Sequence, residues 1–95
     1  MAFAVVAHYR CAPADESTVR AALLKMREHT LDEPGNLAYT VHAEADVPGS
    51  FVLYEQYTDR AGFDAHAAAG YFDELIVRTV RPLLTDRTVT FAQVL

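Results

Sequence analysis

Hydrophobic and polar residues follow regular periods along most of the chain. Residues 3–10, FAVVAHYR, are rich in β-branched and aromatic residues and predict a first strand. Pro13 closes this strand, and Asp15 or Ser17 can cap a helix whose apolar positions recur at i, i+3, i+4 and i+7. This helix is expected to stop at Pro34-Gly35. Its apolar stripe consists of Val19, Ala22, Leu23, Met26 and Thr30.

Two strands joined by a tight turn come next. Residues 36–43, NLAYTVHA, predict the second strand, and residues 51–59, FVLYEQYTD, predict the third. The segment between them contains DVPGS, residues 46–50, with a Pro-Gly pair at its centre. A connection this short indicates a hairpin, so the two strands should be antiparallel neighbours.

The last part of the chain predicts a broken helical region and a final strand. Asp59 can cap a short helix that reaches His66, and the AAAG segment that ends at Gly70 interrupts the pattern. A second helical stripe then continues to about Pro82, and residues 88–95, TVTFAQVL, predict a fourth strand. The members of that stripe are Phe72, Leu75, Ile76, Thr79, Val80 and Leu83.

The predicted order of elements is βαββαβ, the ferredoxin-like or split-βαβ arrangement. Right-handed crossovers place both helical regions on one face of a four-stranded antiparallel sheet. The third strand has large residues in both of its rows, because Val52 and Tyr54 alternate with Leu53, Glu55 and Tyr57. We therefore expect one α+β domain over residues 1–95, with its open sheet face packed against a second copy in a homodimer.

The composition narrows the classes of partner. Of the 95 residues 52% are hydrophobic, and the net charge is −5, with eight basic residues that form no run. Nucleic acids and anionic membranes attract Lys and Arg clusters, so neither is an expected partner. The sequence shows no signal peptide or membrane span, and the single cysteine, Cys11, has no disulfide partner in the chain. These features favour a cytoplasmic location.

Residues 33–75 carry motifs that resemble the antibiotic biosynthesis monooxygenase (ABM) superfamily. The motifs are EPGNLAY at residues 33–39, FVLYEQYTD at residues 51–59, His66, and the aromatic pair Tyr71-Phe72. The resemblance implies a dimeric α/β barrel with a pocket between the sheet and the helices of each subunit. It also implies a scaffold that supports several reactions. Many members have Ser/Thr-Pro-His before the phenylalanine, where this chain has AGY at residues 69–71.

Three residues are candidates for catalysis. His66 can act as a general base or be a helix-terminal histidine that satisfies a carbonyl. Tyr57 can donate a hydrogen bond to a developing oxyanion or form an aromatic wall. Glu55 can be an acid, a base or an orienter of the histidine, or a structural carboxylate paired with backbone or with an arginine such as Arg10 or Arg78.

Four more side chains are expected to bind the substrate as pocket walls: Leu53, Phe63, Tyr71 and Phe72. Phe63 falls near a position where some oxygenating members have a tyrosine, and Leu53 stands where some have an asparagine. No pair of histidines has metal-ligand spacing, and no glycine-rich loop predicts a flavin or nicotinamide site. We therefore expect neither a metal nor an organic cofactor, with O₂ as the co-substrate.

The favoured function is cofactor-independent oxidation of a small aromatic, quinol or polyketide-like substrate by O₂. In such a reaction the substrate supplies the electrons, while the protein supplies a dry pocket, a base and an oxyanion donor. Two alternatives stay open. The same groups can serve an isomerase or tautomerase of a small carbonyl compound, or the chain can form a non-enzymatic dimer that binds a small hydrophobic ligand.

Overall fold

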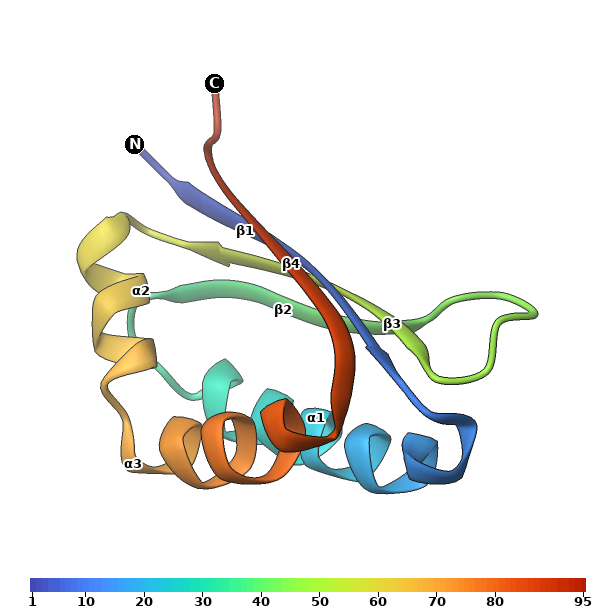
Figure 1. Ribbon diagram of the computed structural model, residues 1–95. Coiled ribbons are helices and arrows are strands. Elements are labelled where there is room, and N and C mark those ends of the chain that lie inside the picture. The colour runs from blue at the N-terminus through green and yellow to red at the C-terminus, as the bar shows by residue number, and fades with distance from the viewer.

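Four antiparallel strands form one sheet in the order β2-β3-β1-β4. In the computed structural model, which covers residues 1–95, helices α1 and α3 lie on one side of this sheet and α2 lies at one end (Figure 1). The elements are β1 (Phe3–Cys11), α1 (Glu16–Leu31), β2 (Asn36–Ala43), β3 (Ser50–Tyr57), α2 (Arg60–Ala67), α3 (Gly70–Phe72) and β4 (Leu84–Gln93). This order and sheet topology confirm the ferredoxin-like α+β fold.

Helix α1 packs on the sheet through its predicted apolar stripe. All five members of the stripe are buried, and the hydroxyl of Thr30 donates to the carbonyl of Met26 at 2.7 Å, so its polar group is satisfied inside the core. Asp15 occupies the N-cap position, but its side chain makes no capping hydrogen bond. The stripe therefore fixes how the helix packs, while the predicted side-chain cap does not form.

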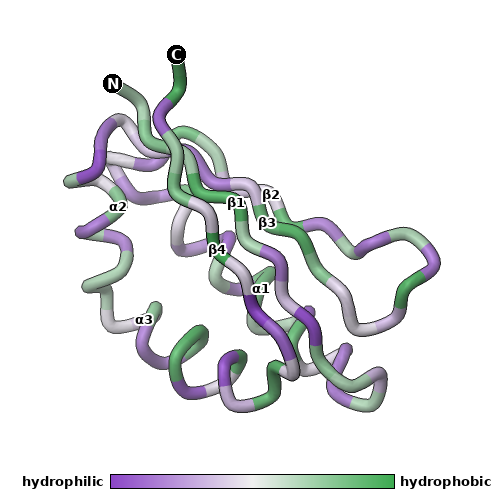
Figure 2. The backbone as a smooth tube through the Cα atoms, turned by 45° about the horizontal axis from the view of Figure 1, so that its top comes forward, coloured by the Kyte–Doolittle hydropathy of each residue, from purple (hydrophilic) through white to green (hydrophobic).

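Strand β3 has the two distinct rows that its sequence predicts. Phe51, Leu53, Glu55 and Tyr57 are buried on the side of the helices, whereas Val52, Tyr54 and Gln56 are half-buried on the other face. Green, hydrophobic segments lie along β1 and β3 in Figure 2, whereas the helices alternate between green and purple. The sheet therefore has one face covered by its own chain and one face that is open.

The open face is apolar at its centre. Val6 lies opposite Tyr54 in the β1–β3 pair and is 42% exposed, and Thr40 lies opposite Tyr54 from the β2 side. Thr90 of β4 completes this row next to Val6. No helix of this chain covers the row, which is the arrangement expected from the sequence.

The helical region after Gly70 is less regular than predicted. A single α-helical turn, α3, leads into a π-helical segment over Asp73–Val80 and then a 3-10 turn over Arg81–Leu83. Ile76 and Val80 of the predicted stripe are nevertheless buried against the core. The side chains that face the sheet were thus correctly predicted, while the helix type was not.

Strand β4 begins at Leu84 rather than at residue 88. Leu84 and Asp86 already pair with Cys11 and Arg10 of β1, although a bulge interrupts the register there. These first residues of β4 are mostly polar and exposed, so their sequence carries no apolar alternation.

A contact between two glycines holds α2 against the loop that follows α1. A Cβ atom added to Gly35 would lie only 2.9 Å from the Cα atom of Gly62. The backbone N–H of Thr58 donates to the carbonyl of Gly35, and Asp59 caps α2 by accepting from the N–H of Gly62, both at 2.9 Å. This close approach brings the segment that carries Glu33 next to the last turn of α2.

Candidate functional site

A cavity of about 190 Å³ lies between β1, β3 and β4 of the sheet and the helical segments around α2 and α3. The carboxyl group of Glu55 and the imidazole of His66 line this cavity together. Phe63, Phe72 and Phe91 provide aromatic walls. The cavity therefore combines two ionisable groups with a mainly apolar surface.

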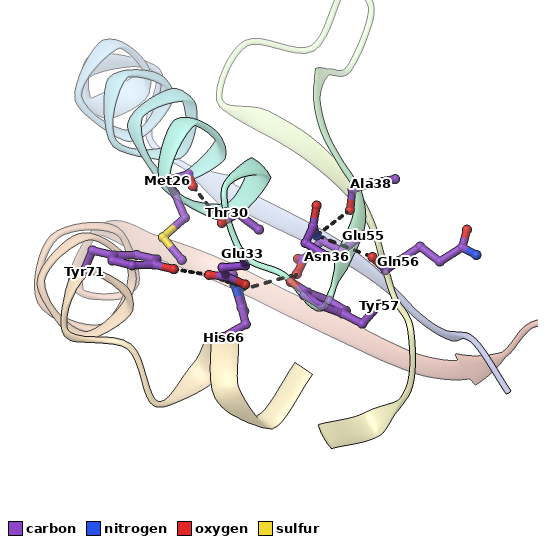
Figure 3. Close-up of polar contacts among 10 residues, drawn as sticks. All are labelled: Met26, Thr30, Glu33, Asn36, Ala38, Glu55, Gln56, Tyr57, His66 and Tyr71. Carbon is purple, nitrogen blue, oxygen red and sulfur yellow. Dashed lines mark hydrogen bonds and ion pairs between the residues drawn. The ribbon is translucent and has the colours of Figure 1, made fainter. Parts of the chain in front are cut away.

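His66 is held in one orientation by Glu33. Its Nδ1 atom lies 3.2 and 3.1 Å from the two carboxylate oxygens of Glu33, which can only accept, so Nδ1 carries the proton (Figure 3). The phenol of Tyr71 donates to the same carboxylate. The imidazole is only 2% exposed, and its ring stands edge-on to Phe72 with centroids 5.3 Å apart. In this tautomer Nε2 is unprotonated and free to accept a proton.

Glu55 lies on the other side of His66. Its Oε1 atom is 3.7 Å from His66 Nε2 and accepts a hydrogen bond of 2.6 Å from the hydroxyl of Tyr57 (Figure 3). The carboxyl is 5% exposed, and no arginine or lysine forms an ion pair with it. A buried carboxyl without a cationic partner favours its protonated form.

The pKa values of these two groups shift in opposite directions. Burial raises the pKa of Glu55 from 4.5 to about 7; the Tyr57 hydrogen bond opposes this rise and the charge of Glu33 adds to it. Burial lowers the pKa of His66 below its ordinary 6.5, although Glu33 acts in the opposite direction. Near neutral pH the cavity therefore contains a neutral imidazole beside a carboxyl that is close to its midpoint of ionisation.

The two tyrosines of this network remain protonated. Burial and the nearby carboxylate of Glu55 raise the pKa of Tyr57, and burial together with the hydrogen bond to Glu33 raises the pKa of Tyr71 to about 12. Both phenols therefore serve as donors to carboxylates and not as bases.

The structure brings together only part of the predicted site. Glu55, His66, Phe63 and Phe72 line the cavity. The remaining three predicted residues do not line it: Leu53, Tyr57 and Tyr71. Leu53 lies in the main hydrophobic core. Tyr57 donates to Glu55, which lines the cavity, whereas Tyr71 donates to Glu33, which holds His66 but does not itself line the cavity.

The suggested arginine partners of Glu55 are wrong. Arg10 lies at an even position of β1 and is exposed, whereas Glu55 pairs with Val5 in the odd, helix-facing row. Arg78 forms an ion pair with Asp73 at 2.8 Å. Tyr57 and His66 are the actual polar neighbours of Glu55.

Several site residues were not identified from the sequence. Glu33 belongs to the motif that follows the first helix, but its partner His66 is 33 positions away, so the motif does not reveal the contact. Tyr9 and Phe91 line the cavity from neighbouring strands, and Arg81 and Arg87 line it from the segment that precedes β4 and from β4 itself. For the residues on strands, Tyr9, Arg87 and Phe91, the sequence signal is the alternation of the strand, which gives a face but not a cavity.

Two kinds of feature are absent from the structure. No helix has the length and apolar character needed to cross a membrane. No group of three or more His, Cys, Asp or Glu side chains is placed to hold a metal ion.

Comparison with known proteins places these features in one family. The family described as "Antibiotic biosynthesis monooxygenase" matches residues 2–78. The Mycobacterium tuberculosis protein Rv0793 is 31% identical with a TM-score of 0.91, over 100% of this chain and 96% of that one. A crystal structure named as an antibiotic biosynthesis monooxygenase is 30% identical with a TM-score of 0.90, over 98% of both chains. No functionally curated protein matches the sequence.

Proposed function

This chain belongs to the antibiotic biosynthesis monooxygenase family, and we propose that it oxidises a small hydroquinone-like aromatic compound with O₂ and without a cofactor. The observation that carries the proposal is the pairing of His66 with Glu55 in a cavity that is otherwise mainly aromatic and aliphatic. A neutral base beside a carboxyl that is partly protonated near neutral pH, in a mainly apolar cavity, is suited to forming and stabilising an organic anion.

The reaction needs no electron carrier, because the substrate supplies all the electrons. Loss of a proton from a substrate hydroxyl gives an electron-rich anion, which passes electrons to O₂. A C–O bond then forms, and the resulting hydroperoxide loses water to give a hydroxyquinone. One hydroquinone and one O₂ are consumed, and one oxidised product and one H₂O are formed.

In this proposal His66 is the general base. Its Nδ1–H is held by Glu33, so Nε2 accepts the substrate proton and the carboxylate of Glu33 stabilises the imidazolium that forms. Burial lowers the pKa of the imidazole, which keeps it neutral and ready to accept a proton at neutral pH. Glu33 acts through His66 and is a positioning residue.

Glu55 takes the role of oxyanion donor that the sequence suggested for Tyr57. The hydroxyl of Tyr57 is directed to Glu55 Oε1 at 2.6 Å and its side chain is fully buried, so it does not reach the substrate. Glu55 itself lines the cavity, and with a pKa of about 7 it retains a proton below neutral pH. That proton, on the carboxyl oxygen not bonded to Tyr57, can be donated to the substrate anion.

Oxygen uptake with a panel of hydroquinones and anthrones tests the proposal. His66→Ala should reduce the rate by at least roughly tenfold, as expected for loss of a general base. His42→Ala is the matched control, because His42 is exposed on β2 and lies outside the cavity. Equal rates for wild type and His66→Ala, or turnover that continues without O₂, would contradict an oxygenase with His66 as its base.

A tautomerase is the second candidate, favoured by the presence of two proton-carrying groups in one cavity. His66 can remove a proton α to a carbonyl and Glu55 can return one to another atom of the substrate. An NMR assay under nitrogen in D₂O separates the two functions, because only isomerisation proceeds without O₂ and incorporates solvent deuterium.

We also propose that two copies pair through the open sheet face. Val6, Val52 and Tyr54 form an apolar centre on this face, which the helices of the chain leave uncovered. Packing sheet against sheet would remove this surface from water. Light scattering of the purified chain measures the expected dimer directly.

A further inference from the structure

Two arginines stand at the outer end of the cavity. Arg81 comes from the 3-10 turn before β4, and Arg87 comes from β4, where it pairs with Tyr9 of β1. Both line the cavity and also a second hollow of about 410 Å³ that adjoins it. The arginines are exposed while Glu55 and His66 are buried, so the cavity has a cationic mouth and an ionisable inner end.

Neither guanidinium is neutralised by the protein. Arg20, Arg60 and Arg78 form ion pairs with carboxylates, but Arg81 and Arg87 form none. The chain has a net charge of −5, so its carboxylates outnumber its basic groups. Two unpaired arginines at the entrance of one cavity therefore leave two positive charges available to bind an anionic ligand. Arg81 also lies over the aromatic wall, with its Cζ atom 5.6 Å from the centroid of the Phe72 ring.

The positive charge of both arginines acts on the Tyr9 phenol, which lines the cavity. Burial and the nearby Glu55 raise the pKa of the Tyr9 phenol, while Arg81 and Arg87 act in the opposite direction. The field at the cavity wall therefore favours negative charge on the side of the arginines.

The volume of the cavity limits the ligand to about one ring inside it. An engineered apolar cavity of about 150 Å³ holds benzene, so about 190 Å³ accepts a single ring with small substituents. Phe63 and Phe91, whose ring centroids are 5.2 Å apart in an edge-to-face arrangement, form part of the wall for such a ring.

We propose that the cavity selects a single-ring aromatic compound that carries a carboxylate, which Arg81 and Arg87 bind while a ring hydroxyl faces His66 and Glu55. This inference rests on the proposed function, whose substrate class it specifies. Arginine presents paired N–H donors that match the two oxygens of a carboxylate. The carboxylate thereby fixes which end of the ring meets the base.

The test compares 2,5-dihydroxybenzoate with its methyl ester, which has the same ring and hydroxyl groups but no charge. Binding to the wild-type protein is measured by calorimetry under nitrogen, so that no oxidation takes place. We expect the acid to bind at least roughly tenfold more tightly than the ester, as charge-assisted hydrogen bonds predict. In the double variant Arg81→Gln/Arg87→Gln the two compounds should bind almost equally.

Arg78→Gln is the matched control, because Arg78 belongs to the same helical region but pairs with Asp73 and does not line the cavity. This variant should keep the wild-type preference for the acid. Equal binding of acid and ester to the wild type, failure of the acid to bind, or a preference that survives in the double variant would overturn the inference.

The proposed oxidation can fail independently of this selectivity. Preferential binding of the acid without subsequent O₂ uptake would support anion recognition and contradict the oxidation. Conversely, O₂ uptake at equal kcat/KM for acid and ester would support the oxidation and overturn recognition of the carboxylate.

Discussion

Replacing Glu55 by glutamine should remove a pH-dependent loss of stability. The wild-type carboxyl is 5% exposed, and burial raises its pKa from 4.5 to about 7. Between these pH values the folded protein retains a proton that the unfolded chain has released. The stabilisation from this proton is fully present below pH 4.5 and is lost as the pH rises through about 7.

The size of the effect follows from the displacement of the pKa. One pH unit corresponds to about 1.4 kcal/mol, so the rise from 4.5 to about 7 corresponds to about 3 kcal/mol of unfolding free energy. This is a large part of the roughly 5–15 kcal/mol that stabilises a typical domain. Glutamine has nearly the same shape, and its carbonyl can still accept from the hydroxyl of Tyr57.

Urea denaturation followed by circular dichroism from pH 4 to pH 8, at one protein concentration, measures the effect. The difference in unfolding free energy between wild type and Glu55→Gln should move by about 3 kcal/mol in favour of the variant as the pH rises. His66 has the opposite sign: its lowered pKa gives stability that is present above pH 6.5 and lost as the pH falls. That contribution is common to both proteins and largely cancels in the difference.

Glu28→Gln serves as the control, since Glu28 is an exposed carboxylate on α1. Its difference from wild type should stay within about 0.5 kcal/mol across the same range. A Glu55→Gln difference that is equally flat would refute the conclusion that Glu55 is a buried carboxyl with a raised pKa.

Four other substitutions test separate features of the structure. Tyr57→Phe removes the hydrogen bond that lowers the pKa of Glu55, so NMR titration should show this pKa above its wild-type value of about 7 and denaturation should show a loss of about 1–3 kcal/mol. Gly35→Ala places a methyl group 2.9 Å from the backbone of α2 and should cost about 1–3 kcal/mol of unfolding free energy. Gly70→Ala, which meets no atom within 4 Å, should change stability by less than about 1 kcal/mol, and equal losses at both glycines would contradict the role of the close contact. Tyr54→Asp should dissociate the proposed dimer in light scattering, and a folded dimer in this variant would contradict pairing through the open face.

The strand and helix faces were predictable because burial imposes a period on the sequence. The alternation in FVLYEQYTD separates a buried row from an open row, and both rows are as expected. The start of β4 was missed because Thr85, Asp86 and Arg87 lie on an exposed edge strand, where polar residues are tolerated. The π-helical segment was missed because its buried positions, Ile76 and Val80, fit the i, i+4 spacing of an α-helix equally well.

The site was harder to predict than the fold, because it depends on contacts between distant segments. His66 and Glu55 were identified by residue type and by resemblance to the family, and they do lie in one cavity. Glu33 was missed because its approach to His66 depends on the close contact of Gly35 with Gly62, which no local pattern reveals. Tyr57 was assigned to the correct face, but only the structure shows that its hydroxyl is directed to Glu55.

The pH dependence of O₂ uptake by wild type and Glu55→Gln tests the central claim most directly. If neutral His66 is the base and protonated Glu55 is the donor, the wild-type rate should fall below the lowered pKa of His66 and again above about pH 7. In Glu55→Gln the amide still donates a hydrogen bond but does not ionise, so the rate should persist above pH 7. An alkaline decline at the same pH in both proteins, or a variant that is inactive throughout, would contradict the assignment of Glu55 as the oxyanion donor.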